Sequence, residues 1–210
     1  MEYSKKLAHQ LLQIKAIKIN TQNFFVWASG ILSPVYCDNR IALSYPEVRN
    51  TIKKGLLQLS ERYKPFDFIA GVATAGIPFG MILAEELNMP FAYIRSAPKS
   101  HGRKNLIEGD LPPDKTVLVV EDLISTGGSS IKAVKAVRAN GNTVRGVISI
   151  FSYNLNIAKM NFDSLDCPYD SITDYDVLIK EAENQNYISG EQYNLIKNWR
   201  SNPENWFKTK

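Results

Sequence analysis

Two adjacent carboxylates, Glu121 and Asp122, stand between an apolar run and a cluster of small polar residues. The apolar run, residues 117–120, contains three valines and predicts a fully buried strand of a parallel sheet. From about residue 130 to 139, apolar residues recur at helical spacing. Between strand and helix lies a cluster that could hold a phosphate through converging backbone N–H groups and the positive end of the helix: Ser125, Thr126, Gly127, Gly128 and Ser129. Because carboxylates repel a bare phosphate, we infer a ligand that also carries hydroxyls or a metal, and a phosphorylated sugar meets that description.

The residues exclude two other common phosphate-binding loops. A P-loop requires Gly-x-x-x-x-Gly-Lys followed by Ser or Thr, whereas the segment from Gly71 to Gly76 continues with Ile77 and Pro78. No Gly-x-Gly-x-x-Gly opens a predicted helix, so the dinucleotide fingerprint is absent as well. The remaining alternative is an ordinary βα turn with exposed acids. Such a turn usually needs only about 2–6 residues and no acid pair, so we favour the ligand-binding interpretation.

A second group of residues that could do chemistry lies between residues 95 and 104, where basic side chains follow a predicted strand. Residues 96–114 show no apolar period and predict a long loop, and long loops inside compact domains are usually functional. Taken alone, a basic run in a loop is more often simply solvated. The alternative is that these cations neutralise an anion that leaves the reaction and exclude water while doing so.

The segment 117–129 resembles the motif with which the type I phosphoribosyltransferases bind 5-phosphoribosyl 1-diphosphate (PRPP), in which two acids follow a hydrophobic strand and precede a Ser/Thr/Gly loop. The basic loop resembles the mobile catalytic loop of the orotate phosphoribosyltransferases, which has the form Arg-x-x-x-Lys-x-His-Gly. Its positions are occupied here by Arg95, Lys99, His101 and Gly102.

Two further segments carry the resemblance. Residues 25–38 are similar to the N-terminal signature of the orotate-using enzymes, an aromatic residue followed by Ser-Gly-x-x-Ser-Pro, which forms part of a hood over the base-binding site. Residues 71–76 correspond to the loop that holds pyrophosphate. The matches together run from about residue 20 to 153. The hood segment and the basic loop are the parts that purine-using relatives lack.

The resemblance implies transfer of the phosphoribosyl group from PRPP to orotate, giving orotidine 5′-monophosphate and pyrophosphate, with Lys99 and Asp122 as catalytic residues. It implies that PRPP is bound by Arg95, Lys99, His101, Glu121, Asp122, Leu123, Ile124, Ser125, Thr126, Gly127, Gly128 and Ser129. Orotate is expected to contact Ser125, Tyr36 and Arg40. The implied cofactor is Mg²⁺, carried by PRPP with few direct protein ligands. The implied assembly is a homodimer in which the catalytic loop of one subunit serves the site of the other.

The chain departs from one branch of the family at four positions. That branch has lysines where this chain has Ala28, Ala75 and Ser96, and an arginine where it has Tyr153. The sequence therefore does not identify the residue that binds the orotate carboxylate. Arg40, just after the hood segment, is a candidate because a guanidinium can bind a carboxylate through two hydrogen bonds; Arg103 and Lys104 are weaker candidates.

Two other classes of function remain as alternatives. One is a phosphoribosyltransferase that uses a purine or uracil instead of orotate. The other is a regulator on the same fold that binds PRPP and nucleic acid without turnover. Such regulators usually have a degraded catalytic loop or an added basic module, and neither feature is visible in this sequence.

The bulk properties set milder limits. A chain of 210 residues can bury one substantial core, and its net charge of +4 suits a small polyanionic ligand without requiring nucleic acid. Its two cysteines, Cys37 and Cys167, form no metal or disulfide pattern, which favours a reducing compartment. Two uncharged stretches are interrupted by Gly, Pro or Asn and do not read as membrane spans, and the N-terminus lacks a signal-peptide core. We therefore expect a cytoplasmic protein.

The predicted fold is α/β, a central mostly parallel sheet flanked by helices (the type I phosphoribosyltransferase fold) with a small N-terminal hood. We expect one domain over 1–210, with the first helix and the hood to about residue 45, a core at about 60–153 and a C-terminal helical extension at about 154–210. The expected strands are 67–72, 91–95, 117–120 and 144–151. The expected helices of the first 153 residues are one of about four turns ending near Lys15, one after a capping box at Ser44–Glu47, one at 78–87 and one at about 130–139. Two more are expected in the tail, one beginning near Thr173 and one beginning at a capping box formed by Ser189 and Gln192.

Overall fold

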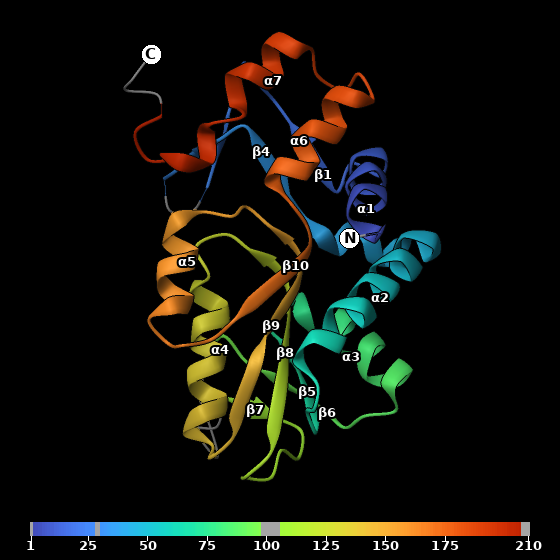
Figure 1. Cartoon of the computed structure of the whole chain (residues 1–210), viewed down its shortest axis with the longest axis vertical. Coiled ribbons are helices and arrows are strands. Elements are labelled where there is room, and N and C mark those ends of the chain that lie inside the picture. Colours follow the sequence, from blue (N-terminus) through green and yellow to red (C-terminus); the bar gives the residue numbers. More distant parts are fainter. Residues whose placement is uncertain (1, 28–29, 98–105, 207–210) are drawn as a thin grey trace.

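The structure is a computed structural model that describes residues 2–27, 30–97 and 106–206 (Figure 1). Its centre is a sheet of six described strands in the order β10–β9–β8–β5–β6–β7. Neighbouring strands run parallel except for β7, which pairs antiparallel with β6. The strands are β5 (Phe68–Val72), β6 (Phe91–Ile94), β7 (Ile107–Glu108), β8 (Thr116–Ile124), β9 (Thr143–Ser152) and β10 (Tyr169–Asp174).

Helices cover both faces of this sheet, which is why its central strands are apolar throughout. On β8, Leu118 and Val120 belong to a core cluster that includes residues of α1, α2 and α3. Val117 and Val119 point to the other face, into a second cluster with residues of α4 and α5. Figure 1 shows α4 and α5 on one side of the sheet and α2 and α3 on the other. The helices are α1 (Glu2–Gln13), α2 (Pro46–Ser60), α3 (Gly76–Leu87), α4 (Gly128–Ala139) and α5 (Asn156–Asp163).

A second layer of structure lies beyond the carboxyl ends of the strands. It contains the hood, which we define as residues 17–37 as far as they are described, and the C-terminal helices α6 (Tyr175–Asn184) and α7 (Gly190–Ile196). The hood is built from two short antiparallel pairs, β1 with β4 and β2 with β3. These strands are β1 (Ile17–Ile19), β2 (Phe25–Val26), β3 (Leu32–Ser33) and β4 (Val35–Cys37). In Figure 1, α6 and α7 lie beside β1 and β4 at the top of the molecule.

Three short 3₁₀ helices complete the described structure: η1 (Asn39–Ser44), η2 (Glu61–Tyr63) and η3 (Trp199–Ser201). The first of them corrects the capping box expected at Ser44. Because Ser44 is the last residue of η1, the residue that precedes α2 is Tyr45, and it makes no side-chain cap. The capping box of Ser189 and Gln192 at α7 is confirmed, with both hydrogen bonds formed.

The tail differs most from expectation. It contains α5 and a strand, β10, besides the two expected helices. Because β10 pairs in parallel with β9, the central sheet extends beyond residue 153 and the tail is not purely helical. The helix expected near Thr173 begins at Tyr175, where the Asp174 side chain accepts a hydrogen bond from the Val177 backbone N–H. None of the helices in the described part of the chain has the length and apolar character needed to span a bilayer.

Candidate active site

The acid pair lies at the carboxyl end of β8. The strand continues through both acids to Ile124, so the expected end at residue 120 was too early. The cause is the neighbouring strand β9, which pairs with Glu121 and Leu123 through Ser149 and Phe151. The acids are therefore held by a sheet ladder and not by a loop.

Glu121 is turned toward the start of α4 and is only 4% exposed. Its Oε2 accepts hydrogen bonds from the hydroxyls of Ser129 at 2.9 Å and Ser130 at 3.3 Å. Its Oε1 accepts from the backbone N–H of Asp122 at 3.1 Å. Burial, and then the charge of Asp122, raise the pKa of the Glu121 carboxyl well above its usual range. The Ser129 hydroxyl, expected to contact phosphate, thus donates to Glu121 in this structure.

Asp122 is held mainly through its backbone. The side-chain amide of Asn39 donates to the Asp122 carbonyl at 2.8 Å, while the Asp122 carboxylate lines an open cleft. Burial raises the pKa of this carboxyl above its usual value, although the nearby positive charge of Arg40 works against that shift. An ionised carboxylate in such a cleft can accept hydrogen bonds from two hydroxyls of a ligand.

The Ser/Thr/Gly cluster forms the turn between β8 and α4. Gly127 has a φ of +80°, which favours glycine, and α4 starts at Gly128, two residues before the expected start. The side-chain amide of Asn161 in α5 donates to the Thr126 carbonyl at 2.9 Å and fixes the turn from outside. Backbone N–H groups at a glycine turn and a helix start make a site for an anion.

The cleft that holds the acids, which we call the acid cleft, has a volume of about 410 Å³. Its opposite wall is the turn between β5 and α3. That turn comes close because Gly76 has no side chain, and a Cβ there would lie 2.5 Å from the Val120 carbonyl oxygen. The acid cleft is lined by Cys37, Asp38, Arg40, Ala73, Thr74, Ala75, Glu121, Asp122, Leu123, Ser125 and Ser129.

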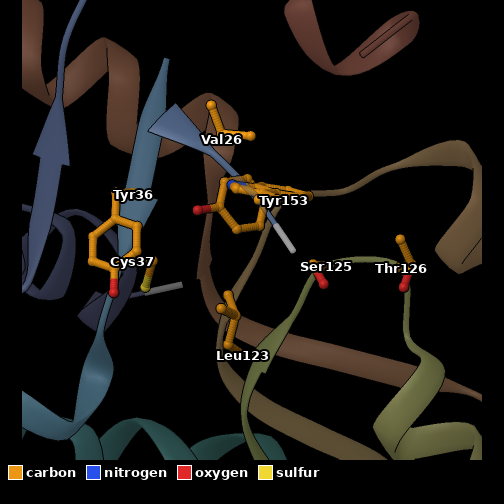
Figure 2. A pocket seen from close by; sticks show the side chains of 8 residues that line it. Val26, Tyr36, Cys37, Leu123, Ser125, Thr126 and Tyr153 are labelled. Carbon is orange, nitrogen blue, oxygen red and sulfur yellow. The ribbon is translucent and has the colours of Figure 1, made fainter. Parts of the chain in front are cut away.

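A second cavity, the apolar pocket, also has a volume of about 410 Å³ and lies between the hood and the end of β8. Figure 2 shows Tyr36 and Cys37 on one side of it, Ser125 and Thr126 on the other, and the Tyr153 ring between them. The complete lining is Val26, Trp27, Tyr36, Cys37, Leu123, Ser125, Thr126 and Tyr153. Because Cys37, Leu123 and Ser125 line both cavities, the two are neighbours. Together they offer a polar space for a charged sugar beside an aromatic space for a flat ring.

The structure brings most of the residues predicted from the sequence to these two cavities. Ser125 and Tyr36 lie at the apolar pocket, whereas Arg40 lines the acid cleft and not the pocket. Its guanidinium makes two hydrogen bonds to Asp38, Nε to Oδ1 at 2.6 Å and Nη2 to Oδ2 at 2.9 Å. The assignment of Arg40 to orotate stays a prediction, and its position favours the charged side of the site.

The other predicted residues lie apart from the cavities or outside the described residues. Arg95 pairs with Glu108, Nη1 to Oε1 at 3.3 Å, and its Nε donates to the Ala97 carbonyl. Ile124 is fully buried in the core beneath the site. Lys99 and His101 fall outside the described residues, as do Arg103, Lys104 and Ala28.

Several residues of the site were not identified as such from the sequence. In the sequence, Tyr153 drew notice only because one branch of the family has an arginine at this position. In the structure its ring forms a wall of the apolar pocket together with Trp27, with 4.7 Å between the two ring centroids. Asn39 and Asn161 were missed because each acts on a backbone carbonyl far away along the chain. No local spacing signals such a contact. Trp27 lies within the signature of residues 25–38, and that signature was the sequence signal that could have identified it as a residue of the site.

Comparison with known proteins is consistent with this geometry. Residues 44–181 match the family model of the phosphoribosyl transferase domain. The chain is 47% identical over 209 residues to an orotate phosphoribosyltransferase of Cytophaga hutchinsonii, covering 99% of this chain and 100% of that protein. It is 46% identical over 203 residues to one of Porphyromonas gingivalis, covering 96% and 97%. Among solved structures, the orotate phosphoribosyltransferase of Aeropyrum pernix superposes with a TM-score of 0.75 at 28% identity, covering 87% of this chain and 99% of that one.

Proposed function

The chain belongs to the orotate phosphoribosyltransferases, and from that premise we infer that it transfers the 5-phosphoribosyl group of PRPP to orotate. The products are orotidine 5′-monophosphate and pyrophosphate, a step of pyrimidine biosynthesis. The observation that carries this proposal is the pair of neighbouring cavities that share Ser125. One cavity presents carboxylates and a phosphate-binding turn, and the other presents aromatic side chains.

The ribose of PRPP is proposed to lie over the acid pair. Transfer at the anomeric carbon passes through a state in which the ribose carries positive charge. The Asp122 carboxylate accepts the ribose hydroxyls, holds their orientation as the ring flattens and stabilises the developing charge. Glu121 is nearly buried and already hydrogen-bonded. Its main part is therefore to fix the start of α4 against β8, with the ribose contact left chiefly to Asp122.

The 5′-phosphate is proposed to bind at the turn before α4, through the backbone N–H groups from Ser125 to Ser129 and the hydroxyls of Ser125 and Thr126. The hydrogen bond from the Asn161 side chain to the Thr126 carbonyl supports phosphate binding at this turn, because the bond keeps the turn in one conformation before the ligand binds. Orotate then occupies the apolar pocket, with Tyr36 and Ser125 as its polar contacts.

Negative charge develops on the departing pyrophosphate, and Lys99 is proposed to neutralise it with help from Arg95 and His101. PRPP brings Mg²⁺ to the site. The acid cleft fits such an ion because the Asp122 carboxylate at the end of β8 offers oxygen atoms, which Mg²⁺ prefers as ligands. When bound, the ion would supply positive charge that offsets the charge of the pyrophosphate, and Asp122 would be the carboxylate that helps to hold it.

We further propose that the enzyme works as a homodimer in which Lys99 of one subunit serves the other site, and that it acts in the cytoplasm. Two cysteines that remain free thiols, Cys37 and Cys167, are compatible with a reducing compartment.

The proposal is tested by base competition. Purified protein is given PRPP, Mg²⁺ and equal concentrations of orotate, uracil and adenine, and the nucleotide products are separated. Orotidine 5′-monophosphate should dominate. Uridine or adenosine monophosphate as the main product would move the chain to another base specificity. Binding of PRPP without any nucleotide product would favour a regulator.

A further inference from the structure

The apolar pocket is enclosed by a part of the molecule that has little support of its own. In the described part of the chain, the β2–β3 pair of the hood joins Phe25 with Ser33 and Val26 with Leu32, and the Trp27 N–H donates to the Ile31 carbonyl at 2.9 Å. A two-stranded pair of this kind is marginally stable in water unless other elements pack against it. Since Val26 and Trp27 line the apolar pocket, whatever holds this pair also sets the shape of the pocket.

Phe25 packs against Tyr36 of β4, with 5.6 Å between ring centroids, and further support comes from the C-terminal end of the chain, beyond residue 181 where the match to the family model stops. Trp199 in η3 is fully buried, and its indole N–H donates to the Leu32 carbonyl of β3 at 2.8 Å. The Gln192 side-chain amide of α7 donates to the Thr21 hydroxyl at 2.8 Å. The Trp206 ring meets Phe24 edge-on, with 5.4 Å between centroids. We call Gln192, Trp199 and Trp206 the C-terminal clamp.

Trp199 is the member of the clamp that reaches the pocket wall. Its ring lies 5.7 Å from Trp27 and 5.9 Å from Tyr153, in edge-on contacts. Trp27 and Tyr153 line the apolar pocket, whereas Trp199 is not among the lining residues in the described part of the chain. Among the described residues, the contacts by which Trp199 reaches the pocket are these two rings and the backbone of β3.

A second path of contacts ties Trp199 to the core. Its ring lies 5.3 Å from Tyr175, whose hydroxyl donates to the Ile196 carbonyl just before η3. The next residue, Arg200, is anchored to Asp176 of α6 by a hydrogen bond from Nε to Oδ1 at 2.9 Å and an ion pair from Nη2 to Oδ2 at 2.8 Å. Trp199 is therefore fixed from the side of α6, so it can act as a rigid support for the hood.

We propose that Trp199 is a positioning residue for the base: it holds Trp27, Tyr153 and the Leu32 backbone in place and so sets the width of the apolar pocket for a flat, ring-shaped substrate. This inference rests on the proposed function for the identity of that substrate. It assigns to the C-terminal segment a part in base recognition and none in PRPP binding, because no residue of the clamp lines the acid cleft in the described part of the chain.

The main test is the Trp199→Phe variant, which keeps an aromatic ring but removes the indole N–H. The matched control is Val137→Ala in α4, a buried residue of the other core cluster, away from the hood. Losing one hydrogen bond and part of the ring contact should raise the KM for orotate about 3- to 10-fold. The KM for PRPP should change by less than about twofold. Val137→Ala should lower the melting temperature and leave both KM values near those of the wild type.

A second readout does not depend on activity. Amide hydrogen exchange in residues 32–37 of the free protein should be at least about threefold faster in Trp199→Phe than in the wild type, and unchanged in Val137→Ala. If Trp199→Phe does not fold, Thr21→Val serves instead. It removes only a hydroxyl that Gln192 contacts and should speed exchange in residues 17–26.

Equal rises of both KM values, or unchanged exchange in the hood, would overturn the proposal and leave Trp199 as an ordinary core residue. If the wild type did not use orotate at all, the proposed function would fail. The exchange comparison would still decide whether the C-terminal clamp holds the hood, so the two failures are distinguishable.

Discussion

The side-chain amide of Asn39 donates a hydrogen bond to the backbone carbonyl of Asp122, with 2.8 Å between Nδ2 and O. Asn39 is fully buried, and its Oδ1 accepts from the Cys37 thiol at the end of β4. One side chain thus joins the hood to the end of β8, where the acid pair lies. The contact fixes the Asp122 backbone and leaves its carboxylate to the acid cleft.

Because the Asp122 carboxylate has no structural role in this contact, Asp122→Asn should keep the fold. An amide has one acceptor oxygen in place of two, its NH2 group can only donate, and it carries no negative charge, so the KM for PRPP should rise about tenfold or more. Steady-state kinetics with varied PRPP, together with the melting temperature, provide the check. Unchanged turnover and unchanged PRPP affinity would make the acid pair structural.

The pH dependence of PRPP binding should report the raised pKa of Asp122. The ionised carboxylate accepts hydrogen bonds at both oxygens, whereas protonation turns one of them into a donor and removes the negative charge. PRPP affinity should therefore fall as the pH drops through the pKa of Asp122, and the fall should begin above the range of an ordinary aspartate. Arg40→Ala removes a positive charge that lowers this pKa, so the fall in PRPP affinity on acidification should begin at a higher pH than in the wild type. Arg40→Lys keeps the charge and should leave the pH of that fall nearly unchanged.

The same pair of Arg40 variants decides between two roles for this residue. Its position at the acid cleft, bound to Asp38, leads us to expect a larger effect of Arg40→Ala on the KM for PRPP than on that for orotate. A rise confined to orotate, with uracil binding unaffected, would instead support the role inferred from the sequence, a guanidinium that binds the orotate carboxylate.

Lys99→Ala tests the basic loop. Removing one charge that stabilises the leaving group should lower kcat about 100- to 1,000-fold and change PRPP binding far less. Lys132→Ala, an exposed lysine on α4, is the control and should behave as the wild type. An equal loss in binding and turnover would mean that Lys99 holds PRPP in the ground state, and no loss would make the loop a solvated connection.

Gly76→Ala tests the close approach of α3 to β8. The added Cβ would lie 2.5 Å from the Val120 carbonyl oxygen, so one of the two elements must shift. We expect a loss of about 1–3 kcal/mol in the free energy of unfolding, measured in urea. Gly190→Ala at the start of α7, where a Cβ would meet the Glu183 side-chain Oε1 at an ordinary 3.5 Å, should cost much less.

The parts of the fold that local patterns determine were predictable from the sequence. The buried run at 117–120 and the alternation of strands and helices gave the parallel sheet because burial on both faces demands apolar residues. β10 was missed because its sequence, Tyr-Asp-Ser-Ile-Thr-Asp, belongs to an edge strand that is only partly buried and mostly polar. α5 has only eight residues, too few for a clear helical period.

The candidate site also contains residues that a local pattern identifies and residues that it does not. The acids and the phosphate turn follow one another in the chain, so a short motif identifies them. The supports of the site, Asn161 behind the phosphate turn and Trp199 behind the hood, meet their partners only after folding. A contact between Trp199 and Leu32 spans 167 residues and leaves no spacing signal in the sequence.

The most direct test of the account is the consumption of orotate by the purified wild-type protein in the presence of PRPP and Mg²⁺, followed by absorbance. The account predicts that orotate disappears in equal amount to the orotidine 5′-monophosphate and pyrophosphate formed, and that the reaction requires both PRPP and Mg²⁺. A protein that binds PRPP but leaves orotate unchanged under these conditions would contradict it.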